Sequence, residues 1–328
     1  MNWPRAIAEG WHPVATLAEL GNKPLATRLL GQPLVLFRAG EQIGLLHDRC
    51  PHRGVPLSAG RVVDGNLACP YHGWRFDTQG ECTQVPGARA CAAAAATALP
   101  VRIEAGLVWT SLATQPGPFP VLPDSLADEH LDRFWWSLAA SRAGLLDALE
   151  NHLDPAHPHF VHPWLVRSPQ RRRTVDVEVR SGPWGAQATY VEQRRNSALL
   201  PMMMEGQRAR SIGRLWPPSI GEVRLESARG ALLSIVVVFA PVDHNLTRPY
   251  AHFASTRGRL PAWFKRLALK AFHLPVLRQD RRLLALQAER GDPRQYHFGP
   301  LDVLARDIWR QANAEDCPED VRQLQMEL

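Results

Sequence analysis

The sequence predicts an α+β fold in two domains, a small antiparallel β-domain followed by a larger one in which a curved antiparallel sheet packs against helices. Three observations favour this fold. Short apolar runs with glycine-containing breaks fill the first part of the chain, four prolines fall within residues 115–124, and longer strand-like and helix-like runs follow. A length of 328 residues also favours two domains over one.

The N-terminal domain is expected to span residues 1–115. Strands are predicted at 25–30, 33–38 and 43–47, because short apolar runs are separated there by tight turns that contain glycine. The run 106–112 is predicted to be a closing strand. Segment 116–124 is too rich in proline for a helix or an inner strand, so it is predicted to be a linker.

The C-terminal domain is expected to span residues 125–328. Its strands are predicted at 173–180, 186–193, 222–226, 231–240 and 250–256, and its helices at 145–154, 260–290 and 302–314. In the long helix an apolar face is expected at Leu267, Leu274, Leu277 and Leu284, and Pro275 should bend or split it. A sheet curled against such helices is expected to enclose a pocket.

Composition and charge exclude several classes of protein. With 45% apolar and 21% charged residues, the chain is an ordinary globular protein. The net charge of +6 invites a nucleic-acid partner, but the basic residues are dispersed, for example at Arg171-Arg172-Arg173 and Arg194-Arg195, without interleaved aromatic residues. No nucleic-acid partner is therefore predicted. The basic clusters are expected to be solvated surface, and the main alternative is that they dock an acidic electron donor.

The chain is expected to be cytoplasmic. Its first residues lack the pattern of a signal peptide, and the longest apolar-rich run, 231–242, is too short to span a bilayer. Two of the five cysteines belong to the motif described next, and the odd remainder of Cys82, Cys91 and Cys317 argues against a disulfide framework.

The first motif pairs one cysteine with one histidine twice, as Cys50-Pro-His52 and Cys69-Pro-Tyr-His72. Two thiolates and two imidazoles can hold one tetrahedral zinc or a [2Fe–2S] cluster. The mixed pairs favour the cluster, because each loop then supplies one ligand to each iron. Residues that stiffen the loops or let them turn closely flank the ligands: Pro51, Pro70, Gly54 and Gly73.

The second motif places four histidines and an aspartate in the segment 150–162. So many histidines are hard to satisfy with backbone partners alone. Two imidazoles and one carboxylate hold a mononuclear iron with open coordination positions in many oxygenases. Pro158 directly follows His157, and a proline disfavours α-helical geometry at the residue before it.

Together the two motifs resemble those of the Rieske non-haem iron ring-hydroxylating oxygenases. Cys50-Pro-His52-Arg-Gly and Cys69-Pro-Tyr-His72-Gly-Trp resemble the Rieske [2Fe–2S] motif, and Asp154-x-x-His157-x-x-x-x-His162 resembles the iron-binding signature. This resemblance implies an N-terminal Rieske domain and a C-terminal catalytic domain of the helix-grip (START-like) fold.

The resemblance also implies roles for individual residues. His157 and His162 would bind the mononuclear Fe(II), and Asp280 would be the third ligand. Gln279 stands before it, where an acidic residue is usual in the family. Asp292 is an alternative third ligand, but its Gly-Asp-Pro context favours a turn. Asp154 would bridge an iron-bound histidine and His72 of a neighbouring subunit. Asn151 would lie near the iron, whereas His152 and His159 have no implied role.

The implied reaction uses O2 and electrons that originate from NAD(P)H. The chain has no G-x-G-x-x-G motif after a strand, so a separate reductase or ferredoxin is expected as its partner. The resemblance implies a head-to-tail homotrimer, because such contacts place each cluster beside a neighbour's iron. A non-catalytic Rieske electron carrier remains an alternative, because a cluster alone does not show an enzyme.

The expected substrate is an aromatic or other cyclic small molecule. The step from Asn151 to Asp154 and the modest length resemble the homotrimeric vanillate and dicamba O-demethylase branch, so hydroxylation or demethylation is expected, with ring dihydroxylation as the alternative. Candidate pocket residues are Met202, Met203, Met204, Ile212, Leu215 and Trp216. Candidate partners for a substrate carboxylate are Arg194, Arg195 and Arg208.

Overall fold

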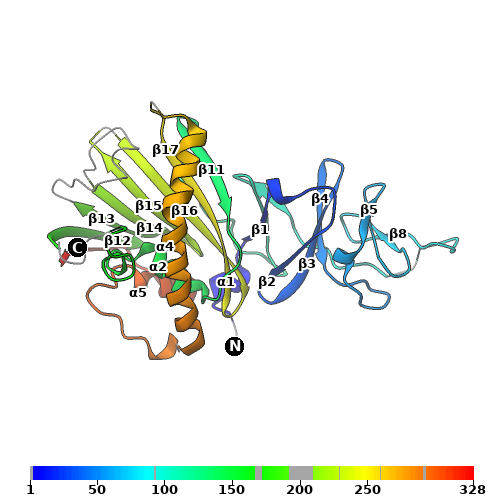
Figure 1. Ribbon diagram of the computed structural model, residues 1–328. Coiled ribbons are helices and arrows are strands. Elements are labelled where there is room, and N and C mark those ends of the chain that lie inside the picture. Colours follow the sequence, from blue (N-terminus) through cyan, green and yellow to red (C-terminus); the bar gives the residue numbers. More distant parts are fainter. Residues whose placement is uncertain are drawn as a thin grey trace. The chain divides into compact units, whose positions relative to one another are not determined.

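The computed structural model describes residues 3–91, 94–166, 172–191, 210–228, 230–258, 260–290 and 293–328 (Figure 1). It divides into two compact units. The N-terminal unit holds residues 8–118 and 240–244, and the C-terminal unit holds the residues up to Ile7, 119–239 and 245–328. The chain passes from one unit to the other after Pro118, inside the proline-rich segment.

The N-terminal unit is built from three small antiparallel sheets. The first has the order β1-β10-β9, the second β2-β3-β4 and the third β5-β6-β7-β8. Their bounds are β1 His12–Thr16, β2 Leu25–Leu29, β3 Gln32–Ala39, β4 Gln42–His47, β5 Arg61–Val63, β6 Asn66–Ala68, β7 Arg75–Phe76, β8 Cys82–Gln84, β9 Arg102–Glu104 and β10 Leu107–Thr110; a short helix, α1, spans Arg5–Glu9. The three strands predicted between residues 25 and 47 and the strand predicted at 106–112 are confirmed.

Two buried clusters hold these sheets together, because alternate side chains of β3 point to opposite faces. Leu34 and Leu36 pack into one cluster with Val14, whereas Val35 and Phe37 pack into the other. The second cluster also contains Cys50 and Cys69, so the motif cysteines are part of a hydrophobic core.

The C-terminal unit is organised around one curved, eight-stranded antiparallel sheet (Figure 1). The strand order is β11-β17-β16-β15-β14-β13-β12-β18. The bounds are β11 Leu131–Ser137, β12 Thr174–Gly182, β13 Gly185–Val191, β14 Arg210–Trp216, β15 Ile220–Ser227, β16 Gly230–Asp243, β17 Leu246–Thr256 and β18 Asp320–Glu327. All five strands predicted for this domain are present, and β11, β14 and β18 were not predicted.

In the described part of this unit, three helices accompany the sheet: α2 Leu145–Leu153, α4 Ala262–Arg290 and α5 Ala305–Ala312. α2 contacts β14, β15 and β17, and α4 contacts α2 and β11. Of the two effects predicted for Pro275, a split does not occur, because α4 is one continuous helix with this proline inside it. No helix in the described part of the chain combines the length and the apolar character needed to cross a membrane.

The predicted apolar face of α4 is only partly correct. Leu284 is buried, but Leu267 and Leu274 are 62% and 41% exposed. The inward face instead carries His273 and Asp280, which line a cavity. Leu277 and Leu284 lie on this inward face, as predicted, whereas Leu267 and Leu274 point away from it.

Candidate metal centres

The first centre lies on two loops of the N-terminal unit. Cys50 follows β4 and Cys69 follows β6, and both cysteines are almost completely buried. His52 and His72 are exposed, and their ring centroids lie 4.7 Å apart. The two loops therefore present paired imidazoles at the surface above paired thiols.

The two loops share one local conformation. The N–H of Gly54 donates to the carbonyl of Cys50, and the N–H of Gly73 donates in the same way to Cys69. Both glycines have positive φ angles, +72° and +71°, which a residue with a side chain rarely adopts. These hydrogen bonds fold each loop back at its cysteine, and the positive φ of the turn explains why glycine follows the ligands in both loops.

The indole of Trp74 stacks on His52, with ring centroids 4.6 Å apart and an interplanar angle of 6°. Each loop offers one thiol and one imidazole, which is the ligand set of a [2Fe–2S] cluster held by two cysteines and two histidines.

Burial raises the pKa of the Cys50 thiol, and the neighbouring thiol of Cys69 raises it further, although backbone N–H groups oppose this effect. A metal ligand must be the thiolate. The free protein therefore holds a proton that cluster binding must displace, and cluster binding is favoured by higher pH.

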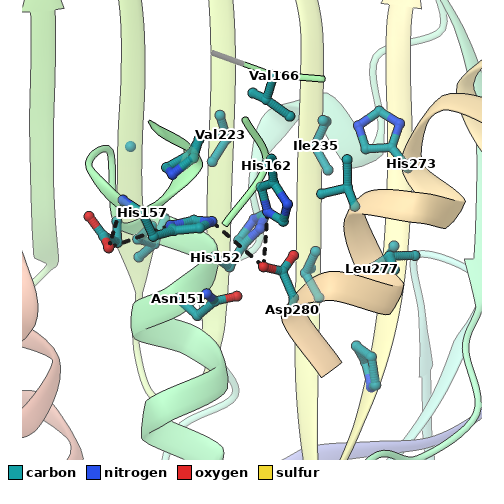
Figure 2. Close-up of a pocket in the computed structure, with 18 of the residues that line it drawn as sticks. Asn151, His152, His157, His162, Val166, Val223, Ile235, His273, Leu277 and Asp280 are labelled. Atoms are coloured by element: carbon teal, nitrogen blue, oxygen red, sulfur yellow. Dashed lines mark hydrogen bonds and ion pairs between the residues drawn. The ribbon is translucent and has the colours of Figure 1, made fainter. Parts of the chain in front are cut away.

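The second centre joins three parts of the C-terminal unit. His157 lies in the 3₁₀ turn His157–His159, His162 follows this turn, and Asp280 projects from α4 (Figure 2). Pro158 lies inside this short 3₁₀ turn, in agreement with the expectation that it disfavours an α-helix at His157. One ligand atom from each of the three residues lies within 4.8 Å of the others.

The distances show which atoms face the centre. Nε2 of His162 lies 3.0 Å from Oδ1 of Asp280, and Nε2 of His157 lies 3.8 Å from the same oxygen. The two imidazoles are nearly perpendicular, at 82°, with centroids 5.3 Å apart. Two imidazole nitrogens and one carboxylate oxygen thus converge on one point, which is the donor set of non-haem iron sites.

The other ring nitrogen of each histidine faces an oxygen acceptor. Nδ1 of His162 lies 2.8 Å from Oε1 of Gln279, and Nδ1 of His157 lies 3.4 Å from Oδ2 of Asp154. In His162 this hydrogen bond fixes the proton on Nδ1 and leaves the lone pair on Nε2 for a metal, whereas in His157 the contact with Asp154 is a longer electrostatic one. Asp154 is itself anchored, because its carboxylate accepts the N–H groups of Ala156 and His157.

Two observations show that the site fits a metal. Nε2 of His162 and Oδ1 of Asp280 are buried and have no hydrogen-bond partner in the described structure. Burial lowers the pKa of His162, but the facing carboxylate of Asp280 and the hydrogen bond with Gln279 outweigh this effect and raise it. An unpartnered buried pair of this kind is costly unless a cation lies between the two atoms.

The remaining histidines of the second motif differ in their surroundings. His152 on α2 is half-buried, and desolvation lowers its pKa to about 4, so it is neutral at physiological pH. It lines the same cavity as Asn151 and Asp154, whereas His159 is buried and is not among the cavity residues. Asn151 is thus placed beside the centre, as the resemblance implied.

A cavity of about 910 Å³ opens beside the three residues. Its wall is largely apolar and comes from several strands and from α4, including Trp136, Val223, Ile235, Phe253, Phe272 and Leu277. Cross-strand pairing explains how distant residues share this wall: Val223 pairs with Ile235, and Trp136 pairs with Ala251. A molecule inside the cavity would be adjacent to the His157, His162 and Asp280 side chains.

The predicted pocket residues have mixed placements. Ile212 is part of the cavity wall, whereas Leu215 is buried on β14 and Trp216 packs under Arg214; neither is among the cavity residues. Met202, Met203, Met204, Arg194, Arg195, Arg208 and Asp292 lie outside the described residues. His273 lines the cavity and Gln279 binds Nδ1 of His162, and the sequence did not predict either role. For His273 the only signal in the sequence is its position, seven residues before Asp280 on one face of the helix.

Comparison with known protein families agrees with this arrangement. A Rieske [2Fe–2S] domain model matches residues 10–101, and the model of the vanillate O-demethylase oxygenase C-terminal domain matches residues 142–307, just over half of the chain. The first match covers both cysteine–histidine loops, and the second covers all three residues of the second centre.

Individual relatives share part of the sequence. Methylxanthine N1-demethylase NdmA of Pseudomonas putida is 33% identical over 180 residues, which cover 48% of this chain and 48% of the relative. The 3-chlorobenzoate-3,4-dioxygenase oxygenase subunit of Comamonas testosteroni is 34% identical over 167 residues, covering 48% of this chain and 38% of the relative. The aligned part thus spans about half the length of these curated relatives or less.

Solved structures share the fold over nearly the whole chain. The structure of Pseudomonas putida CBB5 NdmA with caffeine has a TM-score of 0.79 at 22% identity, covering 93% of this chain and 90% of that one. Dicamba monooxygenase bound to dicamba has a TM-score of 0.80 at 20% identity, covering 94% and 98%. The chain therefore belongs to the Rieske aromatic-ring-hydroxylating oxygenases, and it joins a Rieske [2Fe–2S] domain to an oxygenase domain of the vanillate O-demethylase type.

Proposed function

We propose that this protein is the oxygenase component of a Rieske system that hydroxylates or oxidatively demethylates an aromatic or other cyclic small molecule. The family implies a Rieske cluster, a mononuclear iron and O2 as co-substrate. One observation carries the proposal: His157, His162 and Asp280 converge at the edge of a large apolar cavity. An electron carrier needs no such cavity beside a second metal site.

Each residue has a defined part in this proposal. Cys50, His52, Cys69 and His72 would hold the cluster, and His157, His162 and Asp280 would hold the iron. When bound, the two groups supply single electrons and a site for dioxygen. Gln279 and Asp154 orient the two imidazoles through their Nδ1 atoms. The apolar wall positions the substrate and excludes water.

The electron path and the assembly are part of the proposal. Asp154 would connect His157 with His72 of a neighbouring subunit in a head-to-tail homotrimer, as the resemblance implies. The electrons would come from NAD(P)H through a separate reductase or ferredoxin. All five cysteines are unpaired, which supports a reducing, cytoplasmic location.

Turnover with labelled dioxygen tests the proposal. The purified protein, with both metal centres loaded, is supplied with NADH and a generic ferredoxin and reductase, and is screened against methoxybenzoates, N-methyl heterocycles and polycyclic compounds. A hydroxylase will incorporate label from ¹⁸O₂ into its product, whereas a demethylase will release formaldehyde and an unlabelled demethylated product. A protein that is reduced but gives neither a labelled product nor formaldehyde with any compound would be an electron carrier.

Ring dihydroxylation is the second candidate, because one of the relatives is named a 3,4-dioxygenase. The same experiment separates the two activities. A diol from dihydroxylation carries two labelled oxygen atoms, and a hydroxylated product carries one. Demethylation leaves the ring product unlabelled, because the inserted oxygen departs with formaldehyde, so this activity is recognised by the demethylated product and by trapped formaldehyde. We expect one of these two results and no doubly labelled diol.

A further inference from the structure

The face of α4 that forms the cavity wall carries two polar residues at a fixed spacing. His273, Leu277, Asp280 and Leu284 recur at intervals of four, three and four residues, which is the repeat of a single helix face, and all four line the cavity. Figure 2 shows His273 and Asp280 at opposite ends of this stretch of the helix. Seven residues of helix correspond to about 10 Å along its axis.

Only one of the two imidazole nitrogens of His273, Nδ1, has a hydrogen bond in the described structure. Its Nδ1 lies 2.8 Å from the carbonyl oxygen of Leu269. A carbonyl oxygen can only accept, so the proton is on Nδ1. Burial lowers the pKa of His273, although the bond to Leu269 opposes this effect. The ring is therefore neutral at physiological pH, and its Nε2 carries a lone pair that accepts a hydrogen bond.

Aromatic neighbours hold this ring in place. Phe253 and Phe272 contact it edge to face, with centroids 5.0 Å and 5.1 Å from that of the imidazole. Both phenylalanines also line the cavity. The Nε2 acceptor thus lies in a wall of flat apolar side chains, where a flat ring compound packs well.

The charges on the described part of the cavity wall do not favour an anion at the His273 end. Asp154 contributes a carboxylate, Asp280 is assigned to the metal, and His152 is neutral because burial lowers its pKa to about 4. Of the two arginines on the described wall, Arg173 is exposed and Arg281 donates to the carbonyl of Ala139. The lone pair of His273 would repel a carboxylate group at that end.

We propose that the substrate is a neutral two-ring aromatic compound whose O–H or N–H group donates to Nε2 of His273 while its opposite end lies at His157, His162 and Asp280. This assignment rests on the proposed function and names its substrate class. A fused two-ring skeleton with its polar group at one end matches the spacing of about 10 Å between the two positions on α4. The acceptor fixes the orientation of the compound in an otherwise apolar cavity.

Binding without turnover tests the assignment. The protein with both metal centres loaded is dialysed anaerobically, without reductant, against 2-naphthol, 2-methylnaphthalene or 2-naphthoate. The methyl compound has the size of the naphthol but no donor, and the naphthoate carries a negative charge. We expect 2-naphthol to bind more tightly than 2-naphthoate. Tighter binding of 2-naphthoate to the wild-type protein would overturn the neutral substrate class.

Variants isolate the hydrogen bond. In His273→Phe, the ratio of the naphthol Kd to the methylnaphthalene Kd should rise roughly fivefold to tenfold, because the acceptor is lost while the aromatic packing remains. His273→Gln retains an acceptor and should keep the wild-type ratio within about twofold, as should the exposed-site control His130→Phe. His273→Leu replaces the phenylalanine variant if that protein does not fold.

An unchanged ratio in His273→Phe or His273→Leu would overturn the assignment. The experiment is independent of the proposed reaction, because neither dioxygen nor electrons are present. Failure of the proposed function would appear as absence of both ¹⁸O-labelled product and formaldehyde, whereas failure of this inference would appear as the unchanged ratio of dissociation constants.

Discussion

The Nδ1 of His162 lies 2.8 Å from Oε1 of Gln279, the residue that immediately precedes Asp280 on α4. One turn of helix therefore presents a carboxylate toward Nε2 of His162 and an amide acceptor toward Nδ1 of the same ring. The amide takes a position where an acidic residue is usual in the family, and it makes the contact that orients the imidazole.

Replacing Gln279 with Leu should weaken iron binding at the second centre. The substitution removes the acceptor of His162 Nδ1, so neither the tautomer nor the orientation of the ring is fixed, and such losses typically cost about 10–100-fold in metal affinity. Competition with a chelator of known affinity measures the change. Gln279→Glu is the matched control, because it keeps an acceptor oxygen at the same position and should retain most of the affinity.

Replacing Asp154 with Asn should reduce turnover far more than it reduces iron content. Asparagine keeps an oxygen that can accept the N–H groups of Ala156 and His157, but it removes the negative charge beside His157 Nδ1. We expect the rate of product formation to fall about 10–100-fold while iron per chain stays constant. Equal losses of iron and of rate would mean that Asp154 acts only by holding the site together.

The anchor at the start of α4 should be important for stability. Nζ of Lys265 donates at 2.7 Å to both Asp132 of β11 and the carbonyl of Thr256 of β17, and its side chain is only 5% exposed. Lys265→Met leaves Asp132 without this partner and should cost roughly 3–5 kcal/mol of unfolding free energy. Lys270→Met on the same helix should cost about 1 kcal/mol or less in the same denaturation experiment.

Glu150 should make the protein less stable as the pH rises. Burial raises its pKa from 4.5 to about 7, and the nearby carboxylate of Asp302 contributes to this increase. The folded state then binds more protons than the unfolded state between these values, so stability falls as the pH rises through this window and is lowest above pH 7.

Glu150→Gln removes this dependence. The unfolding free energy of the variant minus that of the wild type, measured by chemical denaturation, should increase by up to about 3 kcal/mol as the pH rises from 5 to 8. The exposed control Glu289→Gln on α4 should follow the wild type at both pH values. A wild-type curve parallel to that of Glu150→Gln would show that Glu150 ionises normally in the folded protein.

The metal motifs could be predicted from sequence because they are local. Cys50 and His52, or His157 and His162, lie within a few residues of each other, so their chemistry is visible without the fold. The choice of Asp280 needed the family resemblance, since it lies more than a hundred residues away. The structure brings its carboxylate to 3.0 Å from His162, and no local pattern contains that distance.

The cavity could not be predicted in the same way. Its wall combines β11 with β17, and Trp136 pairs there with Ala251, a contact that the sequence separation conceals. β11 and β18 were missed because neither shows a clear alternation of apolar and polar residues; β18 is largely polar and pairs only with β12, at the edge of the sheet. Substrate-facing residues such as His273 therefore emerge only from the assembled sheet and helix.

Iron content per chain tests the central claim most directly. The account predicts three irons and two acid-labile sulfides in the fully loaded wild-type protein. Asp280→Ala should contain two irons with unchanged visible absorption of the cluster, and the exposed control Glu289→Ala on the same helix should retain three. Two irons in the loaded wild-type protein, or loss of the cluster absorption in Asp280→Ala, would contradict the assignment of His157, His162 and Asp280 as a separate iron site.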